Sequence, residues 1–381
     1  MLQRIAIRQQ QQQAAGLLRR RVLTEQRLPG QDAQNIMPRT VQRQGRILVD
    51  FAGNDYLGLS FHPQVIAAQQ QALQRYGCGS TASPLVSGYS EAHALLEQQL
   101  CRLSGHEAAL LLPSGFAGNS ALLKTLFSAA DTVIADKLIH ASMIDALKDH
   151  QVKLRRFPHN NLDAAAKLLA RFPGSALVTE SVFSMDGDSA PLTALAALCQ
   201  QFDSPLIIDD AHGFLLSDSL TVQPFARLVT FGKALGGQGA AILGARALID
   251  FLAANAREYI YSTALAPASC AGVTQALQLA ASGHLQQRLK QNIELFRQEC
   301  QRLGIRLMPS ATAIQPLLLG SSERVMQVAG ELLQQGFLVG AIRPPTVPQG
   351  QGRLRITLSA SHQPTQLQAL ATAIRECCDA G

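Results

Sequence analysis

The sequence has no tryptophan, and aromatic residues make up only 5% of its 381 residues. Proteins that bind single-stranded nucleic acid interleave aromatic side chains with basic ones, so this scarcity argues against that class of partner. The net charge is +6, yet the basic residues form only one short run, Arg19 to Arg21, and otherwise alternate with polar residues. We therefore expect local positive charge to meet an anionic small molecule, not nucleic acid.

Long apolar runs are also missing. No stretch approaches the ~20 residues that a membrane helix needs, and the N-terminal segment has neither the apolar core nor the cleavage site of a secretory signal. The seven cysteines lack metal-ligand spacing, and the adjacent Cys377 and Cys378 make a poor disulfide pair. With 47% hydrophobic and 16% charged residues, the chain is predicted to be a globular cytoplasmic protein with reduced thiols and no metal site.

Short apolar runs alternate with helical segments over the middle of the chain. The runs are HEAALLLPSG, DTVIAD, SALVTE, PLIIDDAHG, ARLVTFGK and AAILG. They are rich in Val, Ile and Leu and are bounded by Gly, Pro, Asp or Ser, as is typical of strands in a mostly parallel sheet with both faces buried. The alternation predicts an α/β doubly wound domain.

Different patterns flank this region. A Gln- and Arg-rich helix followed by an irregular connector precedes it, and a long helical segment leads to strands near IQPLLLG, FLVGAI and RLRITLS after it. A chain of this length is expected to form more than one hydrophobic core. We predict an N-terminal helical arm over 1–48, a large cofactor-binding α/β domain over 49–270 and a smaller α+β domain over 271–381.

Chemically reactive side chains cluster where the predicted strands end, which is where open α/β sheets bind ligands. The strand ends read SGFAGN, DKLIHAS, ESVFSMDGD, DDAHG and TFGK. Pyridoxal 5'-phosphate requires such a set: a lysine for the Schiff base, a carboxylate that keeps the pyridine nitrogen protonated, and backbone N–H groups at a helix start for the phosphate. The strand ends therefore predict a pyridoxal-phosphate site.

Lys233 stands in the stretch TFGKALGGQGAA, between an apolar run and a glycine-rich segment. A surface lysine usually has polar neighbours, whereas glycines allow a ligand or another segment to approach the backbone closely. We therefore predict that Lys233 meets a ligand.

The other candidates each have a structural alternative. Asp209 follows a buried run, so pairing with a pyridinium nitrogen would compensate its burial, although Asp209 or Asp210 could instead cap the next turn. His140 could stack on a flat cofactor or close a strand, and His212 could be a structural loop residue. The turn at Ser114–Phe116 is weak evidence for a phosphate site by itself. Their order and joint placement favour the cofactor site.

Several motifs follow one another in a recognisable order. They are NDYLGLS, SGYSEAH, LPSGFAGN, DKLIHASMIDA, ESVFSMDGDSAPL, IDDAHG, VTFGKALGGQGAA and IYSTALAPA. Together they resemble the α-oxoamine synthases, fold-type I pyridoxal-phosphate transferases that condense an amino acid with an acyl thioester and release carbon dioxide. The resemblance spans roughly residues 19–362. It implies a mostly parallel seven-stranded-type sheet, a smaller α+β C-terminal domain and a homodimer with the active site at the subunit interface.

The resemblance also implies substrates. LVSGYS, VFSMDGDSAPL and RPPTVPQGQGRLRITLSASH are most similar to family members that join L-alanine to a pimeloyl thioester in biotin biosynthesis. The acyl carrier can be coenzyme A or a carrier protein, and the basic run at Arg19 to Arg21 could meet the phosphates of either. Condensation of glycine with acetyl-coenzyme A, or use of a longer acyl chain, remains an alternative. A non-catalytic protein that kept the fold is disfavoured because Lys233 and Asp209 are both present.

Roles for individual residues follow from the resemblance. Lys233 would form the Schiff base and later move the α-proton, Asp209 would pair with the pyridine nitrogen, and His140 would stack on the ring, which makes these three the catalytic candidates. The other cofactor contacts that it implies are Gly115, Phe116, Ser184, His212, Thr230 and, from the neighbouring subunit, Ser262 and Thr263. The substrate-side positions that it implies besides His140 are Arg19, Asn54, Arg343 and Thr346. The planar fork of Arg343 suits a carboxylate.

Overall fold

The structure is a computed structural model that describes residues 1–14, 18, 21–26 and 40–379. The chain divides into two compact units. Unit 1 comprises Met1–Gly53 and Lys290–Gly381, and unit 2 comprises Asn54–Leu289. The N-terminal segment thus belongs with the C-terminal part of the chain in one unit, while the three-part division drawn from the sequence stays a prediction.

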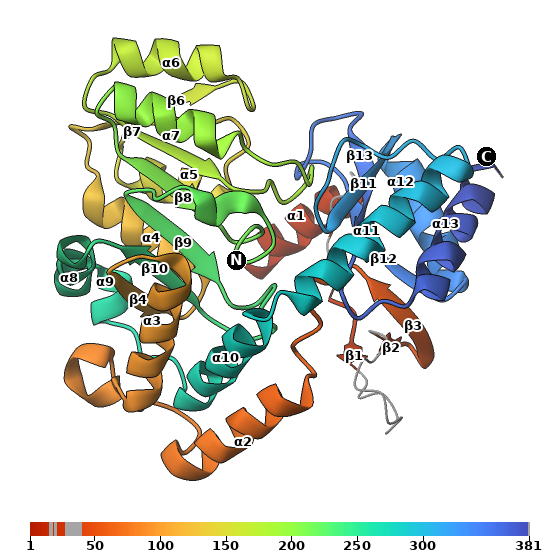
Figure 1. Ribbon diagram of the computed structural model, residues 1–381. Helices are drawn as coiled ribbons and strands as arrows, with labels where there is room; N and C mark the ends of the chain where they lie inside the picture. Colours follow the sequence, from red (N-terminus) through yellow and green to blue (C-terminus); the bar gives the residue numbers. More distant parts are fainter. Residues whose placement is uncertain (15–17, 19–20, 27–39, 380–381) are drawn as a thin grey trace. The chain divides into compact units, whose positions relative to one another are not determined.

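Unit 2 is built around a seven-stranded sheet with the order β4-β10-β9-β8-β7-β5-β6 (Figure 1). Its strands are β4 (Ala108–Leu112), β5 (Thr132–Asp136), β6 (Lys153–Phe157), β7 (Ala176–Glu180), β8 (Leu206–Asp209), β9 (Ala226–Thr230) and β10 (Ala240–Gly244). β9, β8, β7, β5 and β6 run parallel, whereas β10 is antiparallel to both β9 and β4. The predicted mostly parallel sheet is confirmed.

Helices cover both faces of this sheet (Figure 1). The helices of unit 2 are α2 (Pro63–Tyr76), η1 (Pro84–Gly88), α3 (Glu91–Ser104), α4 (Gly115–Leu126), α5 (Ala141–Asp149), α6 (Leu162–Arg171), α7 (Leu192–Gln201), η2 (Asp218–Thr221), α8 (Arg246–Asn255), α9 (Arg257–Ile260) and α10 (Pro267–Ala280). Ile207 packs into a core with α4, α5 and α8, whereas the next residue, Ile208, packs into a core with α6 and α7. Successive residues of a strand point to opposite faces, so both faces of β8 are buried.

The edge strand β6 was not among the apolar runs of the sequence. Its residues, KLRRF, are largely exposed, and only Phe157 is buried. Charged side chains are typical of edge strands because they hinder pairing with another chain. A search for apolar runs cannot find such a strand.

Unit 1 contains a six-stranded sheet with the order β1-β2-β3-β12-β13-β11. Its strands are β1 (Thr24–Gln26), β2 (Thr40–Arg43), β3 (Arg46–Phe51), β11 (Ile314–Gly320), β12 (Phe337–Ile342) and β13 (Gly352–Thr357). The three C-terminal strands confirm the prediction for that region. β1 and β2 lie in the connector that was expected to be irregular, and β3 pairs in parallel with β12.

The other elements of unit 1 are helical. They are α1 (Leu2–Ala14), α12 (Ser322–Gln334), α13 (Pro364–Asp379) and most of α11 (His284–Arg302), which begins in unit 2. α1 confirms the predicted N-terminal helix. The long helical segment of the sequence is in fact two helices, α10 and α11, because Gly283 between them has φ +74°, a left-handed conformation that glycine adopts freely.

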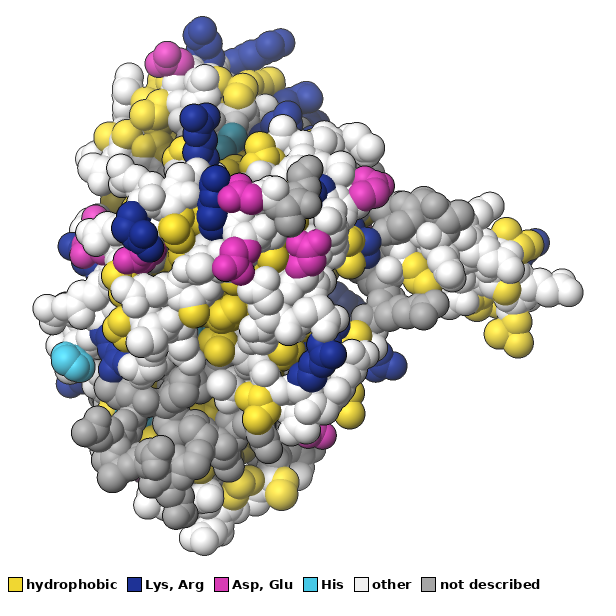
Figure 2. Space-filling model, turned by 90° about the vertical axis from the view of Figure 1, so that its right-hand side faces the viewer, with side chains coloured by type: hydrophobic (Ala, Val, Ile, Leu, Met, Phe, Trp, Pro, Cys, Tyr) yellow, Lys and Arg dark blue, Asp and Glu magenta, His cyan; other side chains and the backbone are white. Residues whose placement is uncertain are grey.

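The charged residues of the face drawn in Figure 2 are dispersed: dark blue Lys and Arg side chains alternate there with magenta Asp and Glu side chains and with uncharged atoms. The excess positive charge is therefore not gathered into one patch on that face. None of the helices in the described part of the chain is both long and apolar enough to cross a membrane.

Candidate active site at the strand ends of unit 2

Asp209 is the last residue of β8 and is only 6% exposed. Its Oδ2 accepts a hydrogen bond from Asn119 Nδ2 at 2.7 Å, and its Oδ1 accepts one from the backbone N–H of Ala211 at 3.0 Å. The second bond is the turn-capping contact that the sequence left open. Capping and ligand binding are compatible here, because each oxygen of a carboxylate offers two lone pairs.

A chain of hydrogen bonds runs from Asp209 to His140. Asn119, on α4, uses its second amide hydrogen to reach Ser142 Oγ at 2.9 Å, and Ser142 Oγ lies 2.8 Å from His140 Nδ1. The backbone N–H of Ser142 also points to His140 Nδ1, at 3.3 Å, so Nδ1 accepts and the neutral ring carries its hydrogen on Nε2. His140 is the N-cap of α5 and its ring is exposed. The site therefore couples the two predicted residues through two buried ones.

A second chain links Asn54 and His212. The hydroxyl of Tyr56 donates to Asn54 Oδ1 at 3.3 Å and lies 2.6 Å from His212 Nδ1. Tyr56 is 1% exposed and His212 is 9% exposed. Tyr56 thus connects a predicted substrate-side residue to a predicted cofactor contact, and it was missed in the sequence although it stands inside the NDYLGLS motif.

Lys233 lies in the tight turn between β9 and β10, where the N–H of Gly236 bonds to the carbonyl of Lys233 at 3.0 Å. Gly236 has φ +61°, and a Cβ atom there would lie 2.3 Å from the backbone nitrogen of Ser60. The group that lies close to this glycine is therefore the backbone of Ser60, in the same chain. The glycine-rich stretch fixes the turn that presents Lys233, and contact of Lys233 with a ligand stays a prediction.

The start of α4 offers a place for an anionic group. Ser114 caps the helix by accepting a hydrogen bond from the N–H of Ala117 at 3.1 Å. Gly115 follows it, and a Cβ atom at Gly115 would lie 2.6 Å from Cγ2 of Thr230. The close approach of Thr230, with the unpaired N–H groups of a helix start, suits a phosphate. Phe116, the next residue, is 56% exposed.

Ser184 occupies a closed loop between β7 and α7. The N–H of Phe183 bonds to the carbonyl of Asp188 at 2.9 Å, and the N–H of Gly187 bonds to the carbonyl of Phe183 at 2.8 Å. These bonds hold Ser184, which is half-buried, in a turn of fixed shape.

Glu180, the last residue of β7, is a further carboxyl group at these strand ends. It is 3% exposed and pairs in register with Asp209 on β8. Within the described residues its Oε1 atom has no hydrogen-bond partner. Burial, and next the negative charge of Asp209, raises the pKa of Glu180 well above its usual value, although the positive charge of Lys233 opposes the shift. Burial and the charge of Asp209 therefore favour the protonated form of Glu180.

Ser262 and Thr263 lie just after α9, and the two residues that follow them are hydrogen-bonded to other parts of unit 2. The N–H of Ala264 bonds to the carbonyl of Ala82 at 3.0 Å, and His93 Nε2 lies 2.8 Å from the carbonyl of Leu265. Thr263 itself is exposed. The segment is held rigidly while Thr263 faces outward.

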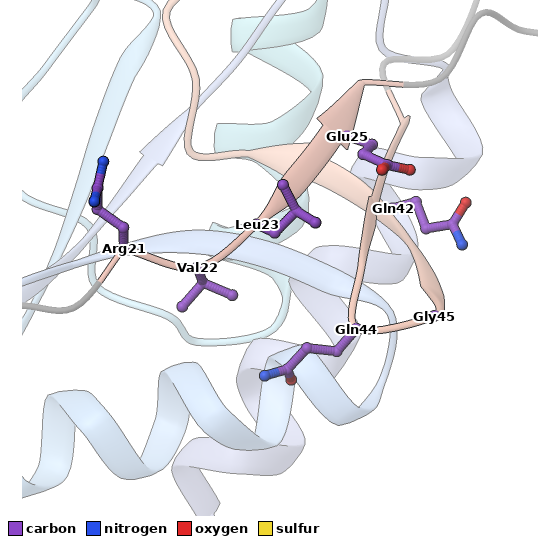
Figure 3. A pocket seen from close by; sticks show the side chains of 7 residues that line it. All are labelled: Arg21, Val22, Leu23, Glu25, Gln42, Gln44 and Gly45. Atoms are coloured by element: carbon purple, nitrogen blue, oxygen red, sulfur yellow. The ribbon is translucent and has the colours of Figure 1, made fainter.

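Unit 1 carries the remaining predicted residues. Arg343 and Thr346 form a turn after β12, with the N–H of Thr346 bonded to the carbonyl of Arg343 at 3.1 Å. Arg19 lies outside the described residues. Unit 1 also has an open pocket of about 500 Å³ (Figure 3). Its lining comes from the segment around β1 and from the β2–β3 turn: Arg21, Val22, Leu23, Glu25, Gln42, Gln44 and Gly45. These residues include a carboxylate, Glu25, but no lysine for a Schiff base.

Comparison with known proteins identifies the family of this chain. Residues 46–374 match the family model of the class I and II aminotransferases. An 8-amino-7-oxononanoate synthase of Cronobacter sakazakii is 46% identical over 86% of this chain and 89% of its own. Another from Yersinia pestis is 44% identical over 96% of this chain and 98% of its own. This chain belongs to the 8-amino-7-oxononanoate synthase family.

Solved structures place this synthase family among the fold-type I enzymes. Serine palmitoyltransferase from S. paucimobilis, with a bound pyridoxal-phosphate–myriocin aldimine, superposes with a TM-score of 0.90 at 25% identity, covering 99% of this chain and 97% of its own. An 8-amino-7-oxononanoate synthase from Francisella tularensis gives a TM-score of 0.73 at 29% identity, covering 87% and 98%. The cofactor of this synthase family is pyridoxal phosphate, and the buried Asp209, the start of α4 and the lysine turn fit it.

Proposed function

We propose that this chain catalyses the decarboxylative condensation of L-alanine with a pimeloyl thioester, which yields 8-amino-7-oxononanoate, carbon dioxide and a free thiol for biotin biosynthesis. The observation that carries the proposal is the hydrogen-bonded chain from Asp209 through Asn119 and Ser142 to His140. It holds a carboxylate and an exposed imidazole at the ends of neighbouring elements, as a flat aromatic cofactor requires. Family membership supplies the substrates.

Asp209 is the residue that would hold a proton on the pyridine nitrogen. When bound, pyridoxal phosphate supplies a ring that accepts the electron pair left on the substrate α-carbon, and it does so best with that nitrogen protonated. A nearby carboxylate favours the protonated form. The bonds from Asn119 and Ala211 keep the Asp209 carboxylate oriented while its charge is buried.

Lys233 would bind the cofactor's carbonyl carbon and, once displaced by L-alanine, remove the α-proton with Nζ. Its turn is fixed on both sides by backbone bonds, so the amine stays within reach. His140 would lie against the ring, with its exposed Nε2–H available to orient a carbonyl oxygen of the acyl donor.

Further residues complete the proposed cofactor site. The start of α4 at Gly115 and Phe116, with Thr230, would hold the phosphate, and Ser184 and His212 would face the phenolic oxygen. The hydrogen bond between Tyr56 and His212, at 2.6 Å, supports His212 in a fixed position.

Four further residues are proposed as substrate contacts. Arg343 would grip the L-alanine carboxylate through two parallel hydrogen bonds, because a guanidinium matches a carboxylate bidentately. Asn54, Thr346 and Arg19 are the other proposed contacts. Coenzyme A and a carrier protein both hold the acyl thioester on a phosphopantetheine arm, so the carrier is tested directly by supplying each.

The active unit is proposed to be a homodimer in which Ser262 and Thr263 reach the phosphate bound by the partner. Apolar side chains in the same unit support this: Leu85 and Val86 on η1 are 55% and 79% exposed, and Tyr261 after α9 is 72% exposed. A second copy of the chain would cover them. Mixing inactive Lys233→Ala with inactive Thr263→Ala protein should restore turnover, since hybrid dimers then contain one intact site. No recovery in proven hybrids would contradict the shared site.

A cytoplasmic location remains part of the proposal. All seven cysteines are free thiols in the structure, as expected in a reducing compartment. Fractionation of the cells that make the protein tests this.

The deciding experiment is thiol release by purified protein supplied with pyridoxal phosphate. L-alanine with pimeloyl-coenzyme A or the pimeloyl-carrier protein is compared with glycine plus acetyl-coenzyme A, and Lys233→Ala is the control. We expect lysine-dependent release only with L-alanine and a pimeloyl donor. Release only with glycine and acetyl-coenzyme A would overturn the substrate assignment.

A further inference from the structure

His159 lies between two acidic side chains that belong to different loops. It follows β6, in the turn before α6, and its Nδ1 is 3.0 Å from Oδ1 of Asp136 while its Nε2 is 2.7 Å from Oδ2 of Asp188. Ionised carboxylates only accept hydrogen bonds, so both ring nitrogens must donate and the ring is a cation. The imidazolium therefore joins two segments that are 52 residues apart.

One of these segments leads directly to His140. Asp136 is the last residue of β5 and is 1% exposed. Its Oδ1 accepts a hydrogen bond from the N–H of Leu138 and its Oδ2 one from the N–H of Asn160, both at 2.8 Å. Asp136 thus shapes the turn that ends at His140, and the cation of His159 compensates the burial of its charge.

The other segment carries Ser184. Asp188 closes the loop around Ser184 through the bond from the N–H of Phe183 to its carbonyl. The ring of His159 stands edge-on to the ring of Phe183, with centroids 4.4 Å apart. Any displacement of Asp188 or Phe183 would therefore move Ser184.

We propose that His159 is a positioning residue for the cofactor, because it ties the turn that carries His140 to the loop that carries Ser184. The inference rests on the roles proposed above for those two residues. A ring held between His140 on one face and Ser184 at its phenolic oxygen requires the two loops to keep a constant spacing. His159 touches neither ring nor substrate in this role and acts through the backbone of both loops.

The charge of His159 gives this link a pH dependence. Burial lowers its pKa, but the hydrogen bonds and negative charges of Asp136 and Asp188 outweigh burial and raise it from 6.5 to about 10. The other groups against the ring, Asn160 and Phe183, do not titrate. Because the folded pKa exceeds the unfolded one, the stabilisation is complete below pH 6.5 and is lost as the pH rises towards 10.

The first test is cofactor affinity, measured by titrating each protein with pyridoxal phosphate and following the visible absorbance. In His159→Gln we expect the dissociation constant to rise about 10-fold to 100-fold, the range seen when partners that orient a ligand-binding group are removed. Asp188→Asn removes the negative charge on the Ser184 side but leaves an acceptor oxygen for His159, so it should give a smaller rise. His150→Gln is the matched control, because His150 lies at the exposed end of α5 and outside the contacts that join Asp136, His159 and Asp188. This variant should bind pyridoxal phosphate as the wild type does.

The second test needs no cofactor. Urea unfolding of the cofactor-free proteins is followed from pH 6.5 to 10, and the loss of stability over this range should be larger for the wild type and His150→Gln than for His159→Gln. Equal affinity for the cofactor in wild type and His159→Gln, equal pH dependence, or a wild type that binds no cofactor would each overturn the proposal. If the wild type binds cofactor but releases no thiol with any substrate pair, the proposed function fails. The positioning role of His159 is then still judged by the cofactor affinity and the pH dependence of stability.

Discussion

Asp209 and Asp210 are neighbours at the end of β8, yet they lie on opposite faces of the sheet and in opposite environments. Asp209 has only neutral hydrogen-bond donors, Asn119 and the N–H of Ala211, among the bonds that the structure gives it. Asp210 is fully buried and receives Arg227 Nη1 at 2.8 Å, as well as the hydroxyls of Ser181 and Ser219. Asp210 already has an internal cation, whereas Asp209 is the one proposed to meet a ligand cation. If that proposal holds, the motif IDDAHG combines a binding residue with a structural residue.

The largest expected effect comes from Asp209→Asn. Without the carboxylate, nothing favours the proton on the pyridine nitrogen, so we expect kcat to fall about 10²- to 10⁴-fold, the range for loss of a positioned proton partner. The free energy of unfolding should fall by about 1–3 kcal/mol, because the bonds from Asn119 and Ala211 go to different oxygens and an amide has only one acceptor oxygen. Steady-state kinetics and urea unfolding measure the two quantities.

Asp210→Asn is the matched comparison for Asp209→Asn, because it makes the same change at the adjacent residue. It should lower stability and leave the kcat of the folded fraction close to that of the wild type. A loss of turnover in Asp210→Asn equal to that in Asp209→Asn would remove the distinction between the two faces.

The next effect concerns Arg227, whose side chain is 0% exposed. Arg227→Met leaves Asp210 buried without its cation, which should cost about 3–5 kcal/mol of stability. It also removes the bonds from Nη2 to the carbonyls of Ser219 and Val222, which hold the loop after His212. Urea unfolding measures the loss. The double variant Arg227→Met/Asp210→Asn should recover part of it, and strictly additive losses would contradict a coupled pair.

Much of the fold of unit 2 could be predicted because its strands are short apolar runs bounded by turn residues. β6 could not, since its exposed KLRRF pattern carries the charges of an edge strand. The pairing of β3 with β12 could not be predicted either, because it joins segments nearly 300 residues apart and no local pattern records such a pairing.

The expectation that ligands bind at strand ends located the candidate site, but it could not assign roles to adjacent residues there. Asp209 and Asp210 look alike in the sequence, and only the register of β8 assigns them to different faces. Asn119, Ser142 and Tyr56 were missed because their role lies in contacts between elements. Glu180 was visible as the end of the run SALVTE, but only the structure shows that its Oε1 atom has no hydrogen-bond partner among the described residues.

Glu180→Gln extends the comparison to a third carboxyl group, whose Oε1 atom has no hydrogen-bond partner among the described residues. Burial raises the pKa of Glu180 and so favours its protonated form, which an amide resembles, and we therefore expect turnover within about threefold of the wild type, which is under 1 kcal/mol in the barrier. Because burial raises the pKa of Glu180, the folded wild type loses stability as the pH rises above the normal glutamate value, and Glu180→Gln should not. Unfolding across a pH series and kcat test this. A loss of turnover as large as in Asp209→Asn would mean that Glu180 works as an anion.

The smallest expected effect is at an exposed ion pair, Arg75 with Glu91, which serves as the counterpart of Arg227 with Asp210. The charged atoms are 2.6 Å apart, about as close as in the buried pair, but the side chains are 66% and 57% exposed. Water screens such a pair, so Arg75→Met should cost less than ~1 kcal/mol, and the cost should shrink further as salt is added. The cost of Arg227→Met should not respond to salt, because the buried pair is not reached by ions. Equal losses in the two variants would mean that distance, not burial, decides what an ion pair contributes in this protein.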